Sequence, residues 1–417
     1  MTEARAEAHT AVRLFVGKGG AGKTTLAVKA ALDHARSGRR ALVVSFDQAH
    51  SVADVLGMHA HRADTAEVVS IEQGLDVLEL DTLALVVARY TALAHVLALS
   101  GTGHEHGVRF GAIDPAEIVG APGVQELLGL HRIVELVDEN RWDTVFVDLP
   151  PTADSVRTLQ LPDLVCGYLE RLWPRHDRIV AGTGTDPRLT VVVAMVGSVV
   201  ASADSVRELV FDRARTSATI VLTPERVGIA EARRTMSAAA LTGLPVDTVM
   251  VNKVLPMLNS ASVGLVGVHP AVFWFEGWRS AQQEVLREVE IMAAGMSLVV
   301  VEQSAHEPVG LPGLGSLAAR VGATQVHERA GVNEPAVAHE SGTGLESIYT
   351  MTMVLPLVDP TTLTLGRVED DVIVGADGIR RRVRLASVLR RCIVVGAEFE
   401  DTTLVVRFAP DPSVWPA

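Results

Sequence analysis

A glycine-rich stretch near the amino terminus constrains the fold of this chain more than any other feature. Residues 14–16 are apolar, as in a buried strand, and lead into Gly17-Lys18-Gly19-Gly20-Ala21-Gly22-Lys23-Thr24-Thr25. Residues 26–32 then have the composition and spacing of a helix. Glycines let backbone N–H groups approach a triphosphate closely, and the following helix presents its positive end to the anion. The pattern Gly-x4-Gly-Lys-Thr therefore predicts a strand, a phosphate-binding loop and a helix.

Two side chains of this loop have predicted chemical roles. Lys23 can reach the β- and γ-phosphates, and the Thr24 hydroxyl can ligate Mg²⁺. The nine residues from Gly17 to Thr25 are the predicted nucleotide-binding residues, and Lys23 is also a catalytic candidate. Lys18 is a second lysine that the plain motif does not require.

The form Lys-Gly-Gly-x-Gly-Lys-Thr, which begins at Lys18, resembles the deviant phosphate loop of one ATPase family. That family contains the arsenite-pump ATPase, the tail-anchored-protein targeting ATPases and the MinD and ParA proteins. In it the extra lysine reaches the nucleotide of the partner subunit. The resemblance covers most of residues 10–323. It implies an α/β P-loop NTPase fold with a mostly parallel sheet flanked by helices, ATP as ligand, a homodimer, and a catalytic role for Lys18.

Asp47 follows the second predicted strand, residues 41–46. The carboxyl ends of strands in α/β sheets carry ligand-binding groups. Spacing alone leaves two interpretations equal, because Asp47 could also cap the helix predicted at residues 52–56. Residues 47–51 resemble the switch I segment of the targeting and arsenite ATPases. In those proteins the aspartate orients or deprotonates the attacking water, and the resemblance implies the same catalytic role for Asp47.

Asp148 ends an apolar strand, residues 144–148, as the Walker B element requires. Such a carboxylate can hold a water on Mg²⁺, although a residue of this type also occurs in ordinary turns. The segment that follows resembles switch II of the same family, and the matching residues are Pro151, Thr152, Arg157, Leu159 and Pro162. The resemblance favours the metal-binding role for Asp148, together with Thr24.

Asn252 lies near the end of another predicted strand, residues 245–254. A side-chain amide offers the donor and acceptor pair that the edge of adenine requires, but an asparagine here could also cap or turn the chain. Its position resembles that of the adenine-reading asparagine of the family, which implies that Asn252 binds the base.

Residues 81–139 and 163–209 are predicted to be mainly helical. Residues 83–99 have little polar face, and periodicity leaves two interpretations equal, a buried core helix or the lining of a hydrophobic groove. In the targeting ATPases the corresponding helical insertions bind hydrophobic client segments. His104 and His106 lie in a glycine-rich loop without a third ligand, so we expect them to be solvated rather than bound to a metal.

The chain changes character after residue 321, where a final helix at residues 310–321 is predicted to close the ATPase domain. Residues 322–344 have the composition of a linker. Short strand candidates follow at 349–356, 362–365, 371–374, 379–385, 393–395 and 403–408, which predicts a small β-sandwich. Residues 396–406 resemble the signature of the α-crystallin domain of small heat-shock proteins. The predicted domains are an ATPase domain at 1–323, a linker at 324–344 and an α-crystallin-like sandwich at 345–417.

Composition excludes several classes of function. The net charge is −13 and no basic block is present, which argues against nucleic-acid binding. The amino terminus has acidic residues and no apolar segment, so it is not a secretory signal, and we expect a cytoplasmic protein. The two cysteines, Cys166 and Cys392, can form neither a four-cysteine zinc site nor a thiolate cluster for arsenite.

These features favour an ATP-hydrolysing homodimeric chaperone or targeting factor that binds hydrophobic protein segments under control of the ATP cycle. A membrane receptor would be a further partner, which the sequence does not identify. One alternative is the energising ATPase of an arsenite pump, although that ATPase carries two nucleotide modules and only one such motif occurs here. Another alternative is a MinD- or ParA-like positioning switch, although no terminal basic amphipathic helix is evident.

Overall fold

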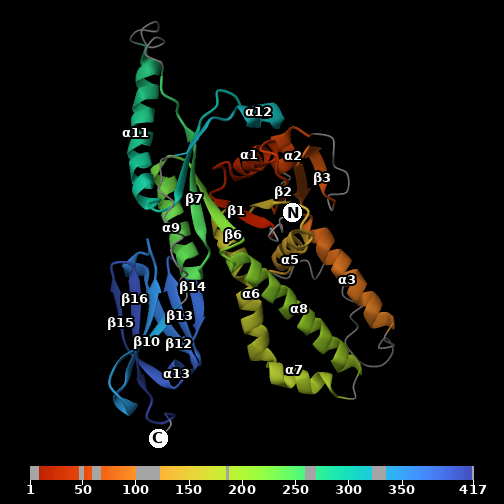
Figure 1. The fold of residues 1–417 in the computed structure, drawn as a ribbon, viewed down its shortest axis with the longest axis vertical. Helices are drawn as coiled ribbons and strands as arrows, with labels where there is room; N and C mark the ends of the chain where they lie inside the picture. Colours follow the sequence, from red (N-terminus) through yellow and green to blue (C-terminus); the bar gives the residue numbers. More distant parts are fainter. Residues whose placement is uncertain are drawn as a thin grey trace, which may run out of the picture. The chain divides into compact units, whose positions relative to one another are not determined.

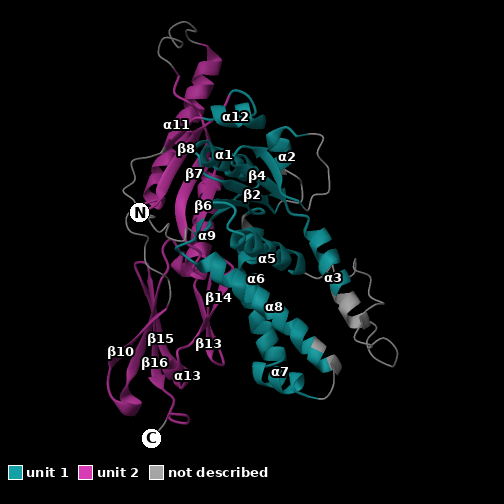
Figure 2. Ribbon diagram, turned by 45° about the vertical axis from the view of Figure 1, so that its right-hand side comes forward, with its two compact units in different colours: residues 1–217, 305–317 teal, residues 218–304, 318–417 magenta. Residues whose placement is uncertain are grey.

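The computed structural model describes residues 9–46, 51–58, 67–99, 123–184, 187–258, 269–321 and 335–415. The chain divides into two compact units (Figure 2). Unit 1 comprises Met1–Ser217 and Ala305–Leu317, and unit 2 comprises Ala218–Ser304 and Ala318–Ala417. The phosphate loop therefore lies in unit 1, whereas Asn252 lies in unit 2. None of the described helices is both long and apolar enough to cross a membrane.

Unit 1 is built on a mainly parallel sheet. Its strands follow the order β3 (Val69–Glu72), β4 (Leu75–Glu79), β2 (Ala41–Ser45), β5 (Thr144–Asp148) and β1 (Ala11–Gly17). All neighbours pair in parallel except β3, which runs antiparallel at the edge. Every residue of β2 and β5 is buried, as expected for strands covered on both faces. The sequence did not predict β3 or β4.

The helices of unit 1 fall into two groups. The helices α1 (Lys23–Arg36), α2 (Ser51–Leu56) and α12 (Gly310–Ser316) pack against one another, and α1 also packs on the sheet. The helices α3 (Thr82–Leu99), α5 (Val124–Asp138), α6 (Thr152–Leu172), α7 (Arg175–Gly182) and α8 (Pro187–Phe211) form the second group. In Figure 1 α3, α6 and α8 extend away from the sheet, and α6 and α7 both pack against α8.

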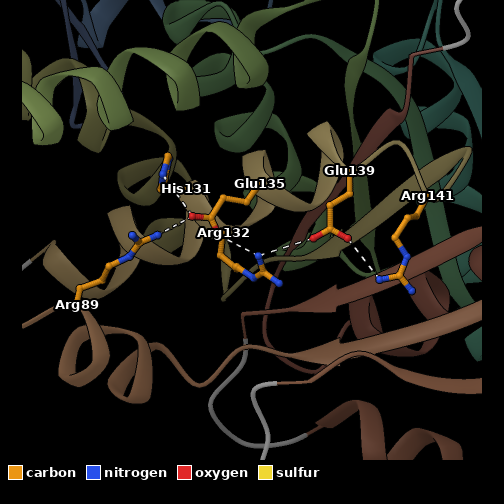
Figure 3. A network of polar contacts seen from close by, with 6 residues as sticks. All are labelled: Arg89, His131, Arg132, Glu135, Glu139 and Arg141. Atoms are coloured by element: carbon orange, nitrogen blue, oxygen red, sulfur yellow. Dashed lines mark hydrogen bonds and ion pairs between the residues drawn. The ribbon is translucent and has the colours of Figure 1, made fainter. Parts of the chain in front are cut away.

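A polar network joins α3 to α5 (Figure 3). Glu135 of α5 accepts a hydrogen bond from Arg89 of α3 at 2.6 Å and another from Arg132 at 2.9 Å. The ring of His131 lies 3.6 Å from the same carboxylate. Burial acts to raise the pKa of Glu135, but the hydrogen bond from Arg132 and the charges of Arg89 and Arg132 outweigh it and lower the pKa below its usual value. The folded state therefore favours the ionised carboxylate.

We expect Glu135→Gln to lower the free energy of unfolding by about 1 kcal/mol at neutral pH, because the partly exposed network loses its charge pairing. A carboxyl group whose pKa is lowered on folding stabilises the protein above its unfolded pKa, and this contribution disappears as the pH falls through the folded value. The wild type should thus lose stability between about pH 5 and pH 3 more steeply than the variant. Urea unfolding followed by circular dichroism at a series of pH values measures this. Parallel pH profiles for the two proteins would contradict the prediction.

Unit 2 contains a second set of paired strands and a β-sandwich. Its first strands follow the order β6 (Thr216–Leu222, from Ala218 onward), β7 (Val246–Val254), β8 (Ser297–Glu302) and β9 (Ala319–Val321). The pairs β6–β7 and β7–β8 are parallel, and β9 pairs antiparallel with β8. The helices α9 (Arg226–Thr242) and α11 (Pro270–Met292) belong to this part. One prediction was wrong in extent. The predicted helix 310–321 ends at Ser316 because residues 319–321 pair with β8.

The carboxyl-terminal part of unit 2 is all antiparallel. One sheet has the order β10 (Ala336–Ser341), β11 (Ile348–Val354), β16 (Thr403–Pro410) and β15 (Cys392–Glu400), and the other has β12 (Thr364–Val368), β13 (Asp371–Ala376) and β14 (Ile379–Arg384). The short helices are Gly344–Glu346, Pro360–Thr362 and α13 (Ser387–Arg390). The sandwich predicted from the sequence is present. Its first strand, β10, was not predicted, because its residues were assigned to the linker.

Helix α9 supplies part of the core of the sandwich. Leu241 of α9 is completely buried in the same apolar cluster as Met351, Val406 and Phe408 of the sandwich strands. Two polar contacts accompany it. Ser237 Oγ donates to Asp377 Oδ2 at 2.7 Å, and Arg381 Nη1 donates to the backbone oxygen of Leu241 at 2.9 Å. The sandwich is therefore packed on α9 by apolar and charge-assisted contacts.

We expect Arg381→Ala to lower the free energy of unfolding of unit 2 by about 2 kcal/mol, since hydrogen bonds from charged groups contribute about that much. Hydrogen exchange should show faster exchange at the carboxyl-terminal end of α9 and in β13 and β14. Arg384→Ala, which removes an exposed arginine from the same strand, is the matched control. Equal exchange in the two variants would show that the Arg381 contact does not stabilise the packing.

Candidate nucleotide site

The phosphate loop connects β1 to α1. Gly20 and Gly22 have positive φ angles of 80° and 91°, which glycine adopts without strain. Gly22 is the N-cap of α1 and has no side chain to occupy the helix end, and the first turn of this fully described helix has no acidic residue. Neither a cap side chain nor an acidic residue of the first turn neutralises the positive end of α1, which suits the binding of an anion. The loop has the backbone shape that the sequence predicted.

The residues of the loop differ in exposure. Gly17 and Ala21 are buried, Gly22, Lys23, Thr24 and Thr25 are partly buried, and Lys18, Gly19 and Gly20 are exposed. A Cβ atom on Gly20 would meet no other atom within 4 Å, and one on Gly19 would lie 3.9 Å from Pro151 Cγ. Pro151 begins the segment predicted to be switch II. The exposed side of the loop is therefore open, and its rim lies beside that segment.

Thr24 and Asp148 meet at the base of the loop. Thr24 Oγ1 donates a hydrogen bond to Asp148 Oδ2 at 2.5 Å, and Asp148 is only 1% exposed. The pairing of strands explains the meeting, because Asp148 lies opposite Phe15 of β1 and Ser45 of β2. A hydroxyl and a carboxylate are the oxygen ligands that Mg²⁺ prefers. The two side chains therefore fit the metal-binding role that the sequence assigned to them.

Asp47 lies outside the described residues. The chain leads toward it from Phe46, whose backbone N–H donates to the backbone oxygen of Asp148 at 2.9 Å. The segment predicted to be switch I thus begins beside the Walker B strand. The catalytic role of Asp47 remains a prediction. His104 and His106 also lie outside the described residues.

Asn252 lies near the end of β7 in unit 2 and is 7% exposed. Its Oδ1 accepts a hydrogen bond from the backbone N–H of Lys253 at 2.9 Å, and Lys253 has a positive φ of 62°. This contact stabilises a turn, which is the alternative role that the sequence left open for Asn252. It occupies one of the lone pairs of Oδ1, so the base-binding role remains a prediction.

Gln282 of α11 supports the same turn and was not identified from the sequence. Its Nε2 donates to the backbone oxygen of Lys253 at 3.2 Å, and its Oε1 accepts from the backbone N–H of Leu255 at 2.8 Å. Gln282 is 5% exposed and is the only polar residue among the buried positions of α11. The only sign of this role in the sequence was a polar residue on an otherwise apolar face of the helix.

The helices α3, α6, α7 and α8 expose apolar side chains. Helix α7, all of whose residues are described, has no buried residue. The exposed apolar residues of the four helices are Leu83, Val87, Leu164, Tyr168, Leu172, Ile179, Val180, Leu189 and Val199. Leu172 is 81% exposed, and Tyr168 is 57% exposed. Periodicity left two interpretations open for residues 83–99, and a wholly buried core is wrong for the described part, where Leu83 and Val87 are exposed. We refer to these nine residues as the apolar helical surface.

Neither cysteine is suited to bind a soft metalloid. Burial, together with the charges of Asp204 and Asp163, raises the pKa of Cys166 to about 11, and burial also raises the pKa of Cys392. A raised pKa disfavours the thiolate, which is the form in which a cysteine binds a metal. Within the described part of the chain, no three histidine, cysteine or acidic side chains are grouped in a way that could hold a metal.

The sheet, the loop and the Thr24–Asp148 pair define a P-loop ATPase. A family model for anion-transporting ATPases (ArsA) matches residues 10–322, and a model for the HSP20-like domain found in ArsA matches residues 346–408. The chain belongs to the ArsA ATPase family, carries the HSP20-like domain at its carboxyl-terminal end and hydrolyses ATP. The predicted family resemblance and fold class are confirmed.

Several relatives are similar over long stretches. Protein Rv2184c of Mycobacterium tuberculosis is 42% identical and is aligned over 100% of both chains. A putative arsenical pump-driving ATPase of Aquifex aeolicus is 25% identical over 94% of this chain and 98% of its own length. ATPase GET3B of Arabidopsis thaliana is 24% identical over 58% of this chain and 64% of its own.

We expect Lys23→Ala and Asp148→Asn each to lower the rate of ATP hydrolysis on the order of 100-fold, as does the loss of one preorganised charge-stabilising group at other active sites. Lys29→Ala is the matched control, because Lys29 lies on the same helix as Lys23 but forms an ion pair with Asp33. Phosphate release under saturating ATP measures the rates. Hydrolysis by Lys23→Ala at the wild-type rate would contradict the assignment of the loop.

Proposed function

We propose that this protein is an ATP-hydrolysing homodimeric chaperone or targeting factor of the cytoplasm. It binds hydrophobic protein segments, and the ATP cycle controls its grip on them. The observation that carries the proposal is the exposure of Leu164, Tyr168 and Leu172, which recur every four residues on α6 and therefore form an apolar stripe on one face of that helix. Exposed apolar patches mark sites of interaction with other proteins or with membranes. The family resemblance independently supports the proposal, because in the targeting ATPases the corresponding helical insertions bind hydrophobic client segments.

The edge strand β15 of the sandwich also supports binding of extended apolar chains. Ile393, Val394 and Val395 on this strand are 47%, 36% and 51% exposed. β15 forms one edge of its sheet, so its outer backbone groups are available for pairing with a further strand.

The proposed nucleotide chemistry uses the residues that the sequence predicted. Lys23 and the backbone N–H groups of residues 19–25 bind the phosphates, Thr24 and Asp148 hold Mg²⁺, Asn252 binds adenine and Asp47 positions the attacking water. A bound Mg²⁺ supplies charge neutralisation at the phosphates. The exposed side chain of Lys18 reaches the nucleotide of the partner subunit, which makes ATP binding and dimer contact interdependent.

The alternative of an arsenite pump ATPase is favoured by the names of several relatives, among them the putative arsenical pump-driving ATPase of Aquifex aeolicus. The two cysteines argue against it here, because a soft metalloid requires a cluster of thiolates and burial raises the pKa of both thiols. Stimulation of ATP hydrolysis by arsenite would support this alternative and contradict the chaperone proposal.

We expect Asp47→Asn, saturated with ATP, to retain a synthetic helical peptide of about 20 apolar residues, the length of a membrane-spanning helix. The same peptide interrupted by three lysines should not be retained. Adding Leu164→Gln, Tyr168→Gln and Leu172→Gln should weaken peptide binding at least about tenfold, since each exposed apolar side chain contributes on the order of 1 kcal/mol when it becomes buried. Fluorescence anisotropy of the labelled peptide measures the affinity.

The matched control for this experiment is Val227→Gln, which removes an apolar side chain that is 60% exposed on α9 of unit 2. It should leave peptide affinity unchanged. Equal affinity of the triple variant and the control would show that the apolar helical surface does not bind the peptide.

A further inference from the structure

Strand β7 is irregular at the point where Asn252 lies. Its register against β8 shifts between Val251 and Val254, so that Asn252 and Lys253 together lie opposite one residue of β8. An extra residue in one strand of a pair is a β-bulge. Lys253 adopts a positive φ of 62°, which is unfavourable for a residue with a side chain. We refer to residues 252–255 as the β7 turn.

Side chains bind the backbone groups of the β7 turn. A bulge takes backbone groups out of the ladder of strand hydrogen bonds, and buried groups of this kind need other partners. The backbone N–H of Lys253 donates to Asn252 Oδ1 at 2.9 Å. Gln282 binds the turn on both sides of Val254, because its Nε2 donates to the backbone oxygen of Lys253 at 3.2 Å and its Oε1 accepts from the backbone N–H of Leu255 at 2.8 Å. One residue of α11 thus holds the shape of the end of β7.

Packing alone does not explain a glutamine at position 282. The side chain is 5% exposed, and burial of an amide is unfavourable unless its donor and acceptor are both bonded. A methionine would fill a similar space without that requirement. The other buried residues of α11 are apolar, namely Val285, Leu286, Val289 and Met292. The polar side chain is therefore explained by the backbone groups that it binds.

The location of the β7 turn indicates a role in ligand binding. β7 pairs in parallel with both β6 and β8, and the carboxyl ends of parallel strands carry the ligand-binding groups of α/β proteins. Bulges at such places change the direction of one side chain. The amide side chain at this bulge is that of Asn252, so the shape of the β7 turn determines where that amide points.

We propose that Gln282 is a positioning residue for recognition of the base. By holding the β7 turn it orients Asn252, and it thereby determines the preference for adenine over guanine nucleotides without touching the nucleotide. Adenine carries an amino donor where guanine carries a carbonyl acceptor, so discrimination depends on the direction of the asparagine amide. The inference rests on the proposed function in the assignment of Asn252 to the base.

The test is steady-state hydrolysis of ATP and of GTP by the full chain, followed by phosphate release. We expect Gln282→Met to lower the ratio of kcat/KM for ATP to that for GTP about tenfold, as for the weakening of one hydrogen bond. The change should lie in KM for ATP, with kcat within about twofold of the wild type, because the base is bound equally before and during phosphoryl transfer. Gln283→Met is the matched control, since it makes the same change at the next, partly buried residue of α11.

The variant Gln282→Glu tests the donated hydrogen bond. An ionised carboxylate accepts from the N–H of Leu255 but cannot donate to the oxygen of Lys253, whereas a protonated carboxyl group can do both. Burial raises the pKa of the introduced carboxyl group. We therefore expect the ATP:GTP ratio of this variant to recover as the pH falls through that pKa, relative to the wild type at each pH. Thermal unfolding of every variant measures stability separately, and lost stability at an unchanged ATP:GTP ratio would overturn the proposal.

The variant Asn252→Ala separates this inference from the proposed function. It should lower the ATP:GTP ratio at least as much as Gln282→Met does. An unchanged ratio in Asn252→Ala, or a wild type that does not distinguish ATP from GTP, would contradict the base-binding role of Asn252 and overturn the inference with it. A lowered ratio in Asn252→Ala with an unchanged ratio in Gln282→Met, or an equal decrease in Gln283→Met, would overturn the inference about Gln282 alone.

Discussion

The hydrogen bond from Thr24 to Asp148 is the interaction on which the nucleotide half of unit 1 depends. It joins the first turn of α1 to the end of β5, and it forms because β5 lies between β2 and β1 with Asp148 opposite Phe15 and Ser45. A carboxylate that is only 1% exposed is stable only with such partners. The same order of strands brings Phe46 to Asp148, because the backbone N–H of Phe46 donates to the backbone oxygen of Asp148. One pairing arrangement therefore joins the phosphate loop to the ends of β5 and β2.

The apolar helical surface of unit 1 remains exposed because the sheet covers only a small part of the helices. α5 buries a face of leucine and valine, whereas α7 buries nothing. α6 packs mainly against α8 and α5, and α8 packs against α6, α7 and α5. The network around Glu135 joins α3 to α5 with charged groups instead of additional apolar contacts. Apolar side chains consequently remain exposed in a protein that belongs to an ATPase family, which is the combination that the proposed function requires.

In unit 2 the two halves of α11 have different surroundings. The carboxyl-terminal half of α11 is packed against the strands, and its Gln282 supports the turn after Asn252. The amino-terminal half, residues 270–281, has no buried residue and exposes Phe273, Trp274 and Trp278. α9 has a similar double function, because its buried face includes Leu241 in the core of the sandwich. The HSP20-like domain is therefore packed on the ATPase part of unit 2 through α9.

The sequence by itself determined the features that depend on neighbouring residues. The glycines of the phosphate loop, the apolar strands ending in Asp148 and Asn252, and the alternating strands of the sandwich are local patterns with direct physical causes. The tertiary structure decided what depends on distant partners. β3, β9 and β10 are strands only because a neighbouring strand accepts them, and Gln282 and Leu241 acquire their contacts from segments far along the chain. The exposure of Trp274 and Trp278 also required the structure, since an apolar pattern is the same for a covered and an uncovered helix face.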